Sequence, residues 1–342
     1  KRAAHLSRRL KETKNLIASV KDDGTVLVEG EEVGRLDGFT FHPTLADGED
    51  KAPILAAARR GLPDEIERRV RAFVASADPA FRLGADGAVK WREVEVARLV
   101  KGDGLYVPRP ELVSSDLLSI DQTQRMAQRL VSFTTAHVEM ILGRLIVLER
   151  PDAAPIGDNK PKTEPKSATV PTDAPVADVP VADAPQDVAP ASLSGAAKGI
   201  AFILYERLGS VPTAEIGHLI RAMQESDKPR LARLGLRFGV ETVYMPELLK
   251  PAQIELRSLL FSLANGAFFE GALPPAGRVA IDAIADVPDA YWLAVGYRRL
   301  GQRVMRVDMV ERVAMLVRVA ARQGQFKIAE DMLSLAGATR EQ

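Results

Sequence analysis

The sequence predicts an α+β protein built from three parts. We expect residues 1–150 to form a domain with a duplicated unit of three strands and one helix, and residues 151–192 to form a linker. Residues 193–342 are expected to form a mainly helical domain with a β-rich patch and a winged-helix-like end. Three observations support this prediction: a repeated strand motif, a proline-rich stretch in mid-chain, and helical spacing of apolar residues on both sides of that stretch.

A strand motif that occurs twice defines the first domain. The first copy is Asp23-Gly24-Thr-Val26 with Val33-Gly-Arg35-Leu36, and 63 positions later it returns as Asp86-Gly87-Ala-Val89 with Val96-Ala-Arg98-Leu99. An Asp-Gly pair favours a tight turn because glycine adopts positive φ, and alternating apolar residues are typical of a strand with one buried face. Third strands are expected at residues 39–43 and 105–108. Because each small sheet has too few strands to be stable alone, the two copies should pack on each other.

Each copy continues into a predicted helix. Apolar residues recur at helical spacing over residues 55–73 in the first copy and over 126–145 in the second. A further amphipathic helix is predicted at residues 1–14, with Leu6 and Leu10 on its inner face and basic residues on its outer face.

The stretch between the two domains has the composition of a tether. Residues 151–192 contain nine prolines together with alanine, valine and aspartate, and almost no large apolar side chains. Such a segment cannot bury enough surface to offset the entropy of ordering, so it predicts an extended, disordered linker. A partner-binding motif within it is the alternative.

The residues after the linker have mostly helical spacing. Helices are expected near residues 203–208, 213–223, 229–236 and 248–263, with Thr213 as the N-cap of the second and Gly266 ending the last. A β-rich patch is expected at 237–246. A hairpin at 297–307 should turn at Gly301, and Asp308 should cap a helix at 309–322. A strand at 326–328 and a helix at 329–335 would continue a winged-helix-like module.

Composition excludes several classes of protein. The net charge is zero, so no global field attracts nucleic acid or an acidic membrane. The chain has no cysteine, which excludes thiolate metal sites, disulfides and cysteine nucleophiles and fits a reducing compartment. No apolar run approaches the roughly 20 residues of a membrane helix, and no signal peptide is recognisable. We therefore expect a soluble cytoplasmic protein with no membrane partner.

The sequence contains no recognisable catalytic motif. It has no Gly-x-x-x-x-Gly-Lys-Ser/Thr phosphate loop, no Gly-x-Ser-x-Gly and no His-Glu-x-x-His. Its four histidines are too scattered for a metal site, and His137 lies in an apolar helical stripe that predicts a core or boundary position. No catalytic residue, metal ligand or cofactor of its own is therefore predicted, and an enzyme of a new kind is the least favoured reading.

Clusters of arginine are the candidate contacts to nucleic acid. The predicted hairpin at 297–307 carries four arginines, a tyrosine and no acidic residue, which gives the local positive field that phosphates require. A second cluster leads into the β-rich patch, and a third lies in the first helix. The candidate residues are Arg298, Arg299, Arg303 and Arg306; Arg230, Arg233 and Arg237; and Arg8 and Arg9. Each cluster has the alternative reading of a solvated surface.

Four segments resemble one protein family. The run Leu234-Gly-Leu-Arg-Phe-Gly-Val-Glu-Thr-Val-Tyr-Met-Pro-Glu-Leu-Leu-Lys-Pro251 resembles a signature in the C-terminal region of a bacterial superfamily-two helicase family. That family is related to the mitochondrial degradosome RNA helicase. Residues 33–41, 194–202 and 303–312 are similar to other segments of the same region, in the same order. The resemblance covers most of the chain from Val33 to Leu335 except the linker.

The resemblance implies a role beside a motor. Members of the family couple ATP hydrolysis to movement along nucleic acid with two RecA-like domains, and no position here matches the motor's phosphate-binding or metal-binding motifs. ATP and magnesium are thus implied only for the missing motor domains, which would act in cis. The chain is expected to guide or grip single-stranded RNA or DNA, or to dock a protein partner. A stand-alone protein-interaction scaffold is the alternative.

Overall fold

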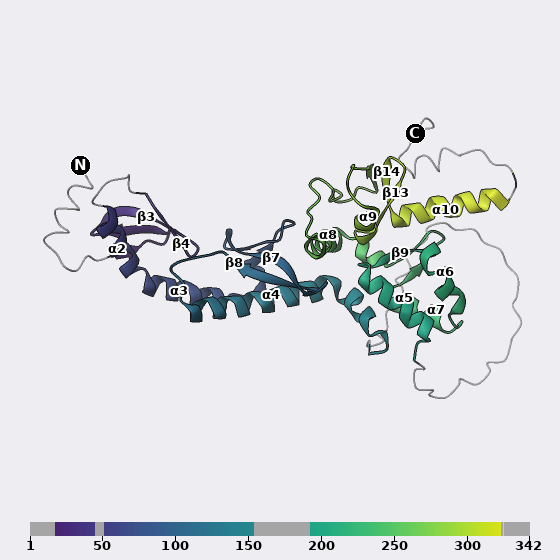
Figure 1. Ribbon diagram of the computed structural model, residues 1–342, viewed down its shortest axis with the longest axis horizontal. Helices are drawn as coiled ribbons and strands as arrows, with labels where there is room; N and C mark the ends of the chain where they lie inside the picture. Colours follow the sequence, from purple (N-terminus) through teal and green to yellow (C-terminus); the bar gives the residue numbers. More distant parts are fainter. Residues whose placement is uncertain (1–17, 45–50, 154–191, 323, 325–342) are drawn as a thin grey trace, which may run out of the picture. The chain divides into compact units, whose positions relative to one another are not determined.

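The computed structural model describes residues 18–44, 51–153, 192–322 and 324, and it has the predicted α+β class (Figure 1). The described chain divides into two compact units. The first runs up to Gly143 and also includes Lys250–Arg278 and Ile284–Tyr291; the second comprises Arg144–Leu249, Val279–Ala283 and the residues from Trp292 onward. This grouping differs from the expected division at residue 193, because residues 250–278 join the first unit. Most of the expected linker, residues 154–191, lies outside the described part of the chain.

The first copy of the repeat forms one antiparallel sheet followed by two helices. The strands lie in the order of the sequence. The elements are β1 (Ala18–Val20), β2 (Thr25–Val28), β3 (Glu31–Asp37), β4 (Thr40–Pro43), α2 (Lys51–Gly61) and α3 (Pro63–Val74).

The second copy forms an equivalent sheet, again with its strands in sequence order. One long helix follows it. The elements are a short 3-10 turn η1 (Asp78–Ala80), β5 (Phe81–Leu83), β6 (Ala88–Trp91), β7 (Val94–Gly104), β8 (Val107–Leu112), α4 (Ile120–Ile146) and η2 (Val147–Glu149).

The register of the two sheets confirms the predicted duplication. Val26 pairs with Gly34 in the first sheet, and Val89 pairs with Ala97, each 63 positions on, in the second. Both sheets have a register shift directly after the first residue of these pairs, next to Val26 and next to Val89. The repeated sequence is therefore also a repeat of backbone geometry.

The Asp-Gly turns are equivalent as well. Gly24 and Gly87 have φ values of +87° and +82°, which side chains with a Cβ rarely adopt. The amide of Leu36 donates to the carbonyl of Gly24 and that of Leu99 to the carbonyl of Gly87, both at 2.8 Å. The glycines thus allow each turn to close onto the third strand of its sheet, β3 or β7.

Two details of the predicted repeat were wrong. Each sheet has four strands rather than three, because short strands, β1 and β5, precede the Asp-Gly turns and pair with the strands that follow them. The helix expected over residues 55–73 is two helices, α2 and α3, which meet at Leu62. Pro63 begins α3, since proline cannot donate the backbone hydrogen bond that a continuous helix would need.

Both copies contribute to one hydrophobic core, as expected. The buried ring of Phe73 in α3 contacts Phe39, in the turn between β3 and β4, at 5.9 Å between ring centroids. It also contacts Phe81 and Trp91 of the second sheet at 5.1 and 5.3 Å. The rings of Phe39 and Trp91 also stack across the two copies. Val26 and Val89 are both fully buried in this same core.

Residues 250–278 extend this core with the helix α8 (Pro251–Asn265), which ends at Gly266 with φ +66°, as predicted. Leu259 and Leu263 of α8 pack into the core formed by the two sheets. Arg257 of the same helix is buried, and this burial lowers the pKa of its guanidinium to about 9.

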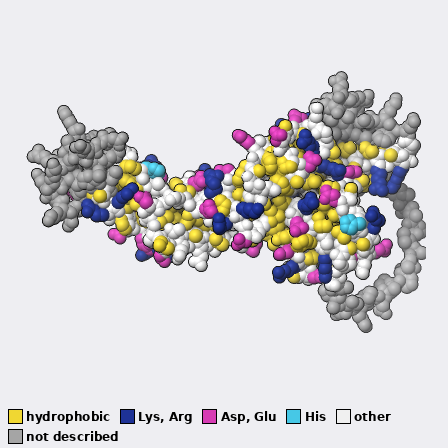
Figure 2. Space-filling view, viewed as in Figure 1, with side chains coloured by type: hydrophobic (Ala, Val, Ile, Leu, Met, Phe, Trp, Pro, Cys, Tyr) yellow, Lys and Arg dark blue, Asp and Glu magenta, His cyan; other side chains and the backbone are white. Residues whose placement is uncertain are grey.

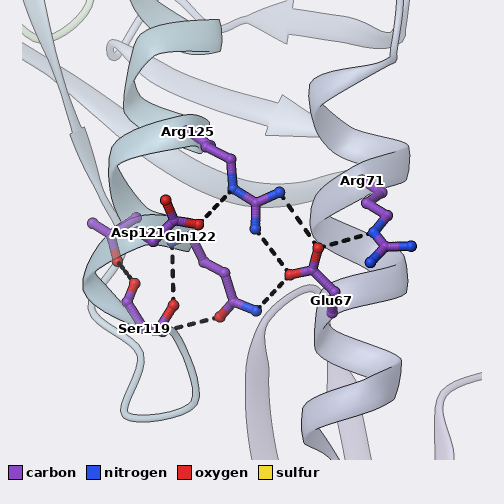
Figure 3. Close-up of polar contacts among 7 residues, drawn as sticks. Glu67, Arg71, Ser119, Asp121, Gln122 and Arg125 are labelled. Carbon is purple, nitrogen blue, oxygen red and sulfur yellow. Dashed lines mark hydrogen bonds and ion pairs between the residues drawn. The ribbon is translucent and has the colours of Figure 1, made fainter.

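A polar network joins α3 to α4 at the surface of this core (Figure 3). The carboxylate of Glu67 accepts hydrogen bonds from Arg125, Gln122 and Arg71, each at 2.9 Å. Asp121 forms an ion pair with Arg125 at 2.9 Å. The hydrogen bonds from Arg125, Gln122 and Arg71, in that order of importance, hold the pKa of Glu67 at about 2.

We expect this network to make the first unit sensitive to acid. The folded pKa of Glu67 lies below its ordinary value of 4.5, so its stabilising effect is complete above pH 4.5 and is lost as the pH falls toward 2. The variant Glu67→Gln should therefore be less stable than the wild type at pH 7, with a difference that narrows on acidification. Urea unfolding at several pH values measures it. The control is Glu139→Gln on the exposed side of α4, for which a similar narrowing would contradict the prediction.

Residues 195–244 of the second unit have the element order of a winged helix-turn-helix. The order of helix, strand, helix, helix and hairpin, with β11 in the middle of the sheet between β9 and β10, is that of this module. Its elements are α5 (Gly195–Glu206), β9 (Ser210–Pro212), α6 (Thr213–Ala222), α7 (Asp227–Arg233), β10 (Arg237–Phe238) and β11 (Thr242–Tyr244). We call the hairpin of β10 and β11, with its loop Gly239–Glu241, the wing.

The winged-helix-like module predicted from the sequence is at a different position in the chain from the one that the structure shows. It was expected at the end of the chain, whose residues 325–342 lie outside the described part, whereas the described module occupies residues 195–244. Thr213 does begin α6, but its hydroxyl donates to the carbonyl of Gly239 at 3.3 Å and does not cap the helix.

The remaining elements are a three-stranded sheet, the short helices η4 and α9, and the longer helix α10. The predicted hairpin is present and turns at Gly301, which has φ +61°. The helix after it begins at Val307, two residues earlier than predicted, so Asp308 lies inside its first turn. The elements are η4 (Pro246–Leu249), β12 (Ala280–Asp282), α9 (Asp289–Ala294), β13 (Tyr297–Leu300), β14 (Arg303–Arg306) and α10 (Val307–Arg322).

One described helical stretch, Ile120–Glu149, is long and apolar enough to cross a membrane by length and composition. A single helix of this kind is weak evidence for a membrane span. Met126, Leu130 and Phe133 form a buried stripe on α4 that packs into the core of the first unit, as in the core helix of a soluble protein.

Candidate nucleic-acid interface

A buried carboxylate fixes the start of α7. Asp227 is 1% exposed and accepts hydrogen bonds from the amide and the hydroxyl of Ser194 at 3.1 and 2.5 Å and from the amide of Gln224 at 2.9 Å. Burial raises the pKa of Asp227, but these hydrogen bonds outweigh it and lower the pKa below its ordinary value. Ser194 is also the N-cap of α5 and accepts from the amide of Ala197. The first and third helices of the module are thus held together where they begin.

The exposed side of α7 is basic. Leu231 is buried, whereas Lys228 and Arg233 are exposed on either side of the small residue Ala232. No carboxylate among the described residues pairs with Lys228 or Arg233. Arg230, which the sequence grouped with them, lies only partly exposed and forms a long ion pair with Asp152 at 3.9 Å. In a helix-turn-helix the second helix is the one that contacts nucleic acid, and α7 is in that position in this module.

The wing continues this basic surface. Arg237 is exposed on β10, four residues after α7 ends, and its side chain hydrogen-bonds to Tyr244 on β11. The structure therefore keeps Arg233 and Arg237 in one module, as the sequence grouped them.

The loop of the wing points its amides at a carboxylate of α10. The amides of Val240, Glu241 and Thr242 donate to the two carboxylate oxygens of Glu311 at 2.5, 3.0 and 2.7 Å. A Cβ on Gly239 would lie where that carboxylate now lies, so only glycine leaves room for it. Three consecutive amides that converge on one anion form a backbone anion-binding nest.

Three of the four hairpin arginines are paired with acidic residues that lie outside the hairpin sequence. Arg298 contacts Glu241 of the wing, Arg303 contacts Asp282 of β12, and Arg306 contacts Asp308 of α10. The ion-pair distances are 3.1, 3.1 and 2.7 Å.

Arg299 is the exception in this hairpin. It is exposed and donates to the carbonyl of Gly301 at 3.4 Å. The hairpin sequence itself lacks acidic residues, but the wing, β12 and α10 supply the carboxylates that pair with its arginines. The local positive field is consequently weaker than the sequence implied.

The remaining predicted contacts, Arg8 and Arg9, lie outside the described residues. On the face that Figure 2 shows, Lys and Arg side chains are interspersed with Asp and Glu, which fits the net charge of zero. The basic residues are therefore local clusters within a mixed surface.

No group of three or more His, Asp or Glu side chains among the described residues could hold a metal ion. His137 is packed against Phe133 with 5.5 Å between ring centroids, and burial lowers its pKa. His137 is only partly buried, which fits the core or boundary position expected for it.

Sequence reasoning missed two residues of this site, Asp227 and Glu311. Asp227 carries a signal that could have been read, since Asp in a first helical turn is a common helix-start residue. Glu311 carries none, because only the fold brings it to a loop 70 positions earlier in the chain.

Comparison of the chain with protein-family models, with curated proteins and with solved structures found no match in any of the three.

Proposed function

We propose that this chain is an accessory part of an ATP-dependent RNA or DNA helicase, and that its winged-helix module binds the single strand that leaves the motor. The observation that carries the proposal is the basic exposed side of α7, where Lys228 and Arg233 have no carboxylate partner among the described residues. Arg237 adds a third positive charge on the adjoining wing. The collinear resemblance to the helicase family supports the same role.

The proposal gives α7 and the wing more weight than the hairpin at 297–306. An arginine that is paired with a carboxylate brings little net charge to a phosphate, because the pair is locally neutral. Arg298, Arg303 and Arg306 are paired in this way, and Arg299 is the hairpin residue that remains as a contact. Such backbone contacts favour binding with little sequence preference.

The motor would lie in the same polypeptide and would supply the sites for ATP and magnesium. The protein would act in the cytoplasm.

We expect the triple variant Lys228→Gln, Arg233→Gln and Arg237→Gln to bind a labelled single strand more weakly than the wild type, by roughly tenfold or more, since each lost cation removes one phosphate contact. The salt dependence should also become shallower. The slope of log affinity against log salt should decrease by about two for a single strand. Fluorescence anisotropy titrations at several salt concentrations measure both effects.

The matched control removes three arginines from the first unit, Arg59→Gln, Arg82→Gln and Arg109→Gln. Each of these is exposed and already paired with a carboxylate. The control variant should bind the strand within about twofold of the wild type. Equal weakening by both variants would show that net charge, and not the α7 surface, determines binding.

A protein-docking role is the second candidate, and the outer side of α4 favours it. Val131 and Met140 are 49% and 75% exposed there; the exposed residues from Gln124 to Ala136 are uncharged, and the exposed charges Glu139 and Arg144 lie beside Met140. Uncharged, partly apolar surfaces are typical of protein contacts. The variant Val131→Glu with Met140→Glu should abolish capture of the motor domains while leaving strand affinity unchanged. If the double variant still captures the motor domains, α4 is excluded as the docking surface.

A further inference from the structure

The nest at the tip of the wing is an anion site that is already occupied from within the chain. The amides of Val240, Glu241 and Thr242 all donate to Glu311, and hydrogen bonds from consecutive amides to an anion are shorter and stronger than those to a neutral acceptor. Protein contacts to nucleic-acid phosphates commonly use backbone amides of this kind.

The shape of the nest does not depend on Glu311. The amide of Gly239 donates to the carbonyl of Thr242 at 3.0 Å, which closes the hairpin turn. The carbonyl of Glu241 accepts from the amide of Thr213 at 2.9 Å and from the guanidinium of Arg298 at 3.0 Å. The loop is thus fixed by bonds on its other side, so the three amides would stay convergent without the carboxylate.

Glu311 can leave the nest without movement of its helix. The start of α10 is anchored by the buried residues Met309 and Val310, which pack with Met305. Glu311 itself is only partly buried, and its side chain has rotatable bonds enough to reach solvent while the backbone stays in place. Two of the carboxylates near it are already engaged: Glu241 with Arg298, and Asp308 with Arg306.

We propose that the amides of Val240, Glu241 and Thr242 bind a phosphodiester of the single strand, and that Glu311 occupies this site until the strand displaces it. The inference rests on the proposed function, since it takes the phosphate from a strand held by α7. The inference adds a phosphate contact made by backbone amides and not by a positively charged side chain. It also adds Glu311 as a competitor for that contact from within the chain. A strand engages the wing only when its other contacts hold a phosphate near enough to compete with the carboxylate.

The first test uses inorganic phosphate as the probe and the amide NMR signals of residues 240–242 in the full chain as the readout. In the variants Glu311→Ala and Glu311→Gln, phosphate should shift these signals, with an affinity roughly tenfold above that of the wild type. Glu311→Gln keeps a neutral acceptor in the nest and serves if the alanine variant is unstable. The double variant Gly239→Ala with Glu311→Ala should not respond, because the added Cβ fills the site. Signals that stay unchanged in both single variants overturn the inference.

The second test adds an unlabelled single strand to the wild-type chain. The signals of residues 240–242 should shift together with those of α7. Binding that shifts α7 but leaves the wing unchanged overturns this inference and leaves the proposed function in place. If no strand binds anywhere, the proposed function fails, and the phosphate titration alone decides whether the wing is an anion site.

The strand affinity of Glu311→Gln gives an independent measure. It should exceed that of Glu215→Gln, a variant with the same change of charge on α6 in the same module, by about threefold or more, since only Glu311 competes for the nest. Equal gains in strand affinity in the two variants would show that net charge causes the effect, and would contradict competition between Glu311 and phosphate for the nest.

Discussion

Replacing Phe73 by alanine should destabilise the first unit by about 4 kcal/mol, the largest effect that we expect from a single substitution. The ring of Phe73 is fully buried and contacts three other aromatic rings, which come from both copies of the repeat. Its removal leaves a cavity where the two copies meet, and relaxation can fill that cavity only in part.

The two tryptophans of the chain allow this to be measured unit by unit. Trp91 belongs to the first unit and Trp292 to the second. In a Trp292→Phe background, fluorescence during denaturant unfolding reports on the first unit alone. The control is Phe268→Ala, because that ring is 56% exposed and should cost less than 1 kcal/mol, on the order of a surface change. Similar losses in both variants would contradict a shared aromatic core.

Replacing Asp227 by alanine should destabilise the second unit by about 3 kcal/mol, because two amides and one hydroxyl lose a buried acceptor. The Asp227→Asn variant keeps the shape of the side chain but has fewer hydrogen-bond acceptor sites, so it should lose about half as much stability as Asp227→Ala. The folded pKa of Asp227 lies below 3.8, so this contribution is present above pH 3.8 and is lost as the pH falls through the folded pKa.

Unfolding followed by Trp292 in a Trp91→Phe background measures these losses. The matched control is Glu225→Ala, an exposed carboxylate just before α7 that should change stability by less than about 0.5 kcal/mol. A loss of strand binding by Asp227→Asn at a temperature where it is fully folded would assign Asp227 a positioning role beyond stability. A stable Asp227→Ala variant would show that the start of α7 does not depend on this carboxylate.

Local chemistry predicted the repeat well and its boundaries poorly. The Asp-Gly turns and the alternation around Val26 and Val89 are local signals, and both copies fold as they indicate. The first strands, β1 and β5, are three residues long, too short to show an alternation, and only pairing with their neighbours makes them strands. Pro63 is a local signal for a helix start, but the apolar spacing continues across it and therefore predicted one helix where there are two.

The candidate site shows the same limit over longer distances. The arginines of the hairpin were identified from a sequence without acidic residues, and their partners Asp282 and Glu241 lie in strands and loops that the chain reaches only by folding. The winged-helix order was missed at residues 195–244 because β9 and β10 have three and two residues. Charge clustering in sequence predicted where basic residues gather, but not which of them remain available for a phosphate.

The shared aromatic core makes the first unit a dimer in a single chain. Each copy alone would expose the apolar face that Phe39, Phe73 and Trp91 now cover, so each copy acts as the other's subunit. The short connection from Ala75 to Ala77 keeps the partners at an effective concentration of about millimolar or more. Lengthening this connection should weaken the unit only with the logarithm of its length, and a cut there should leave two polypeptides that associate as a heterodimer.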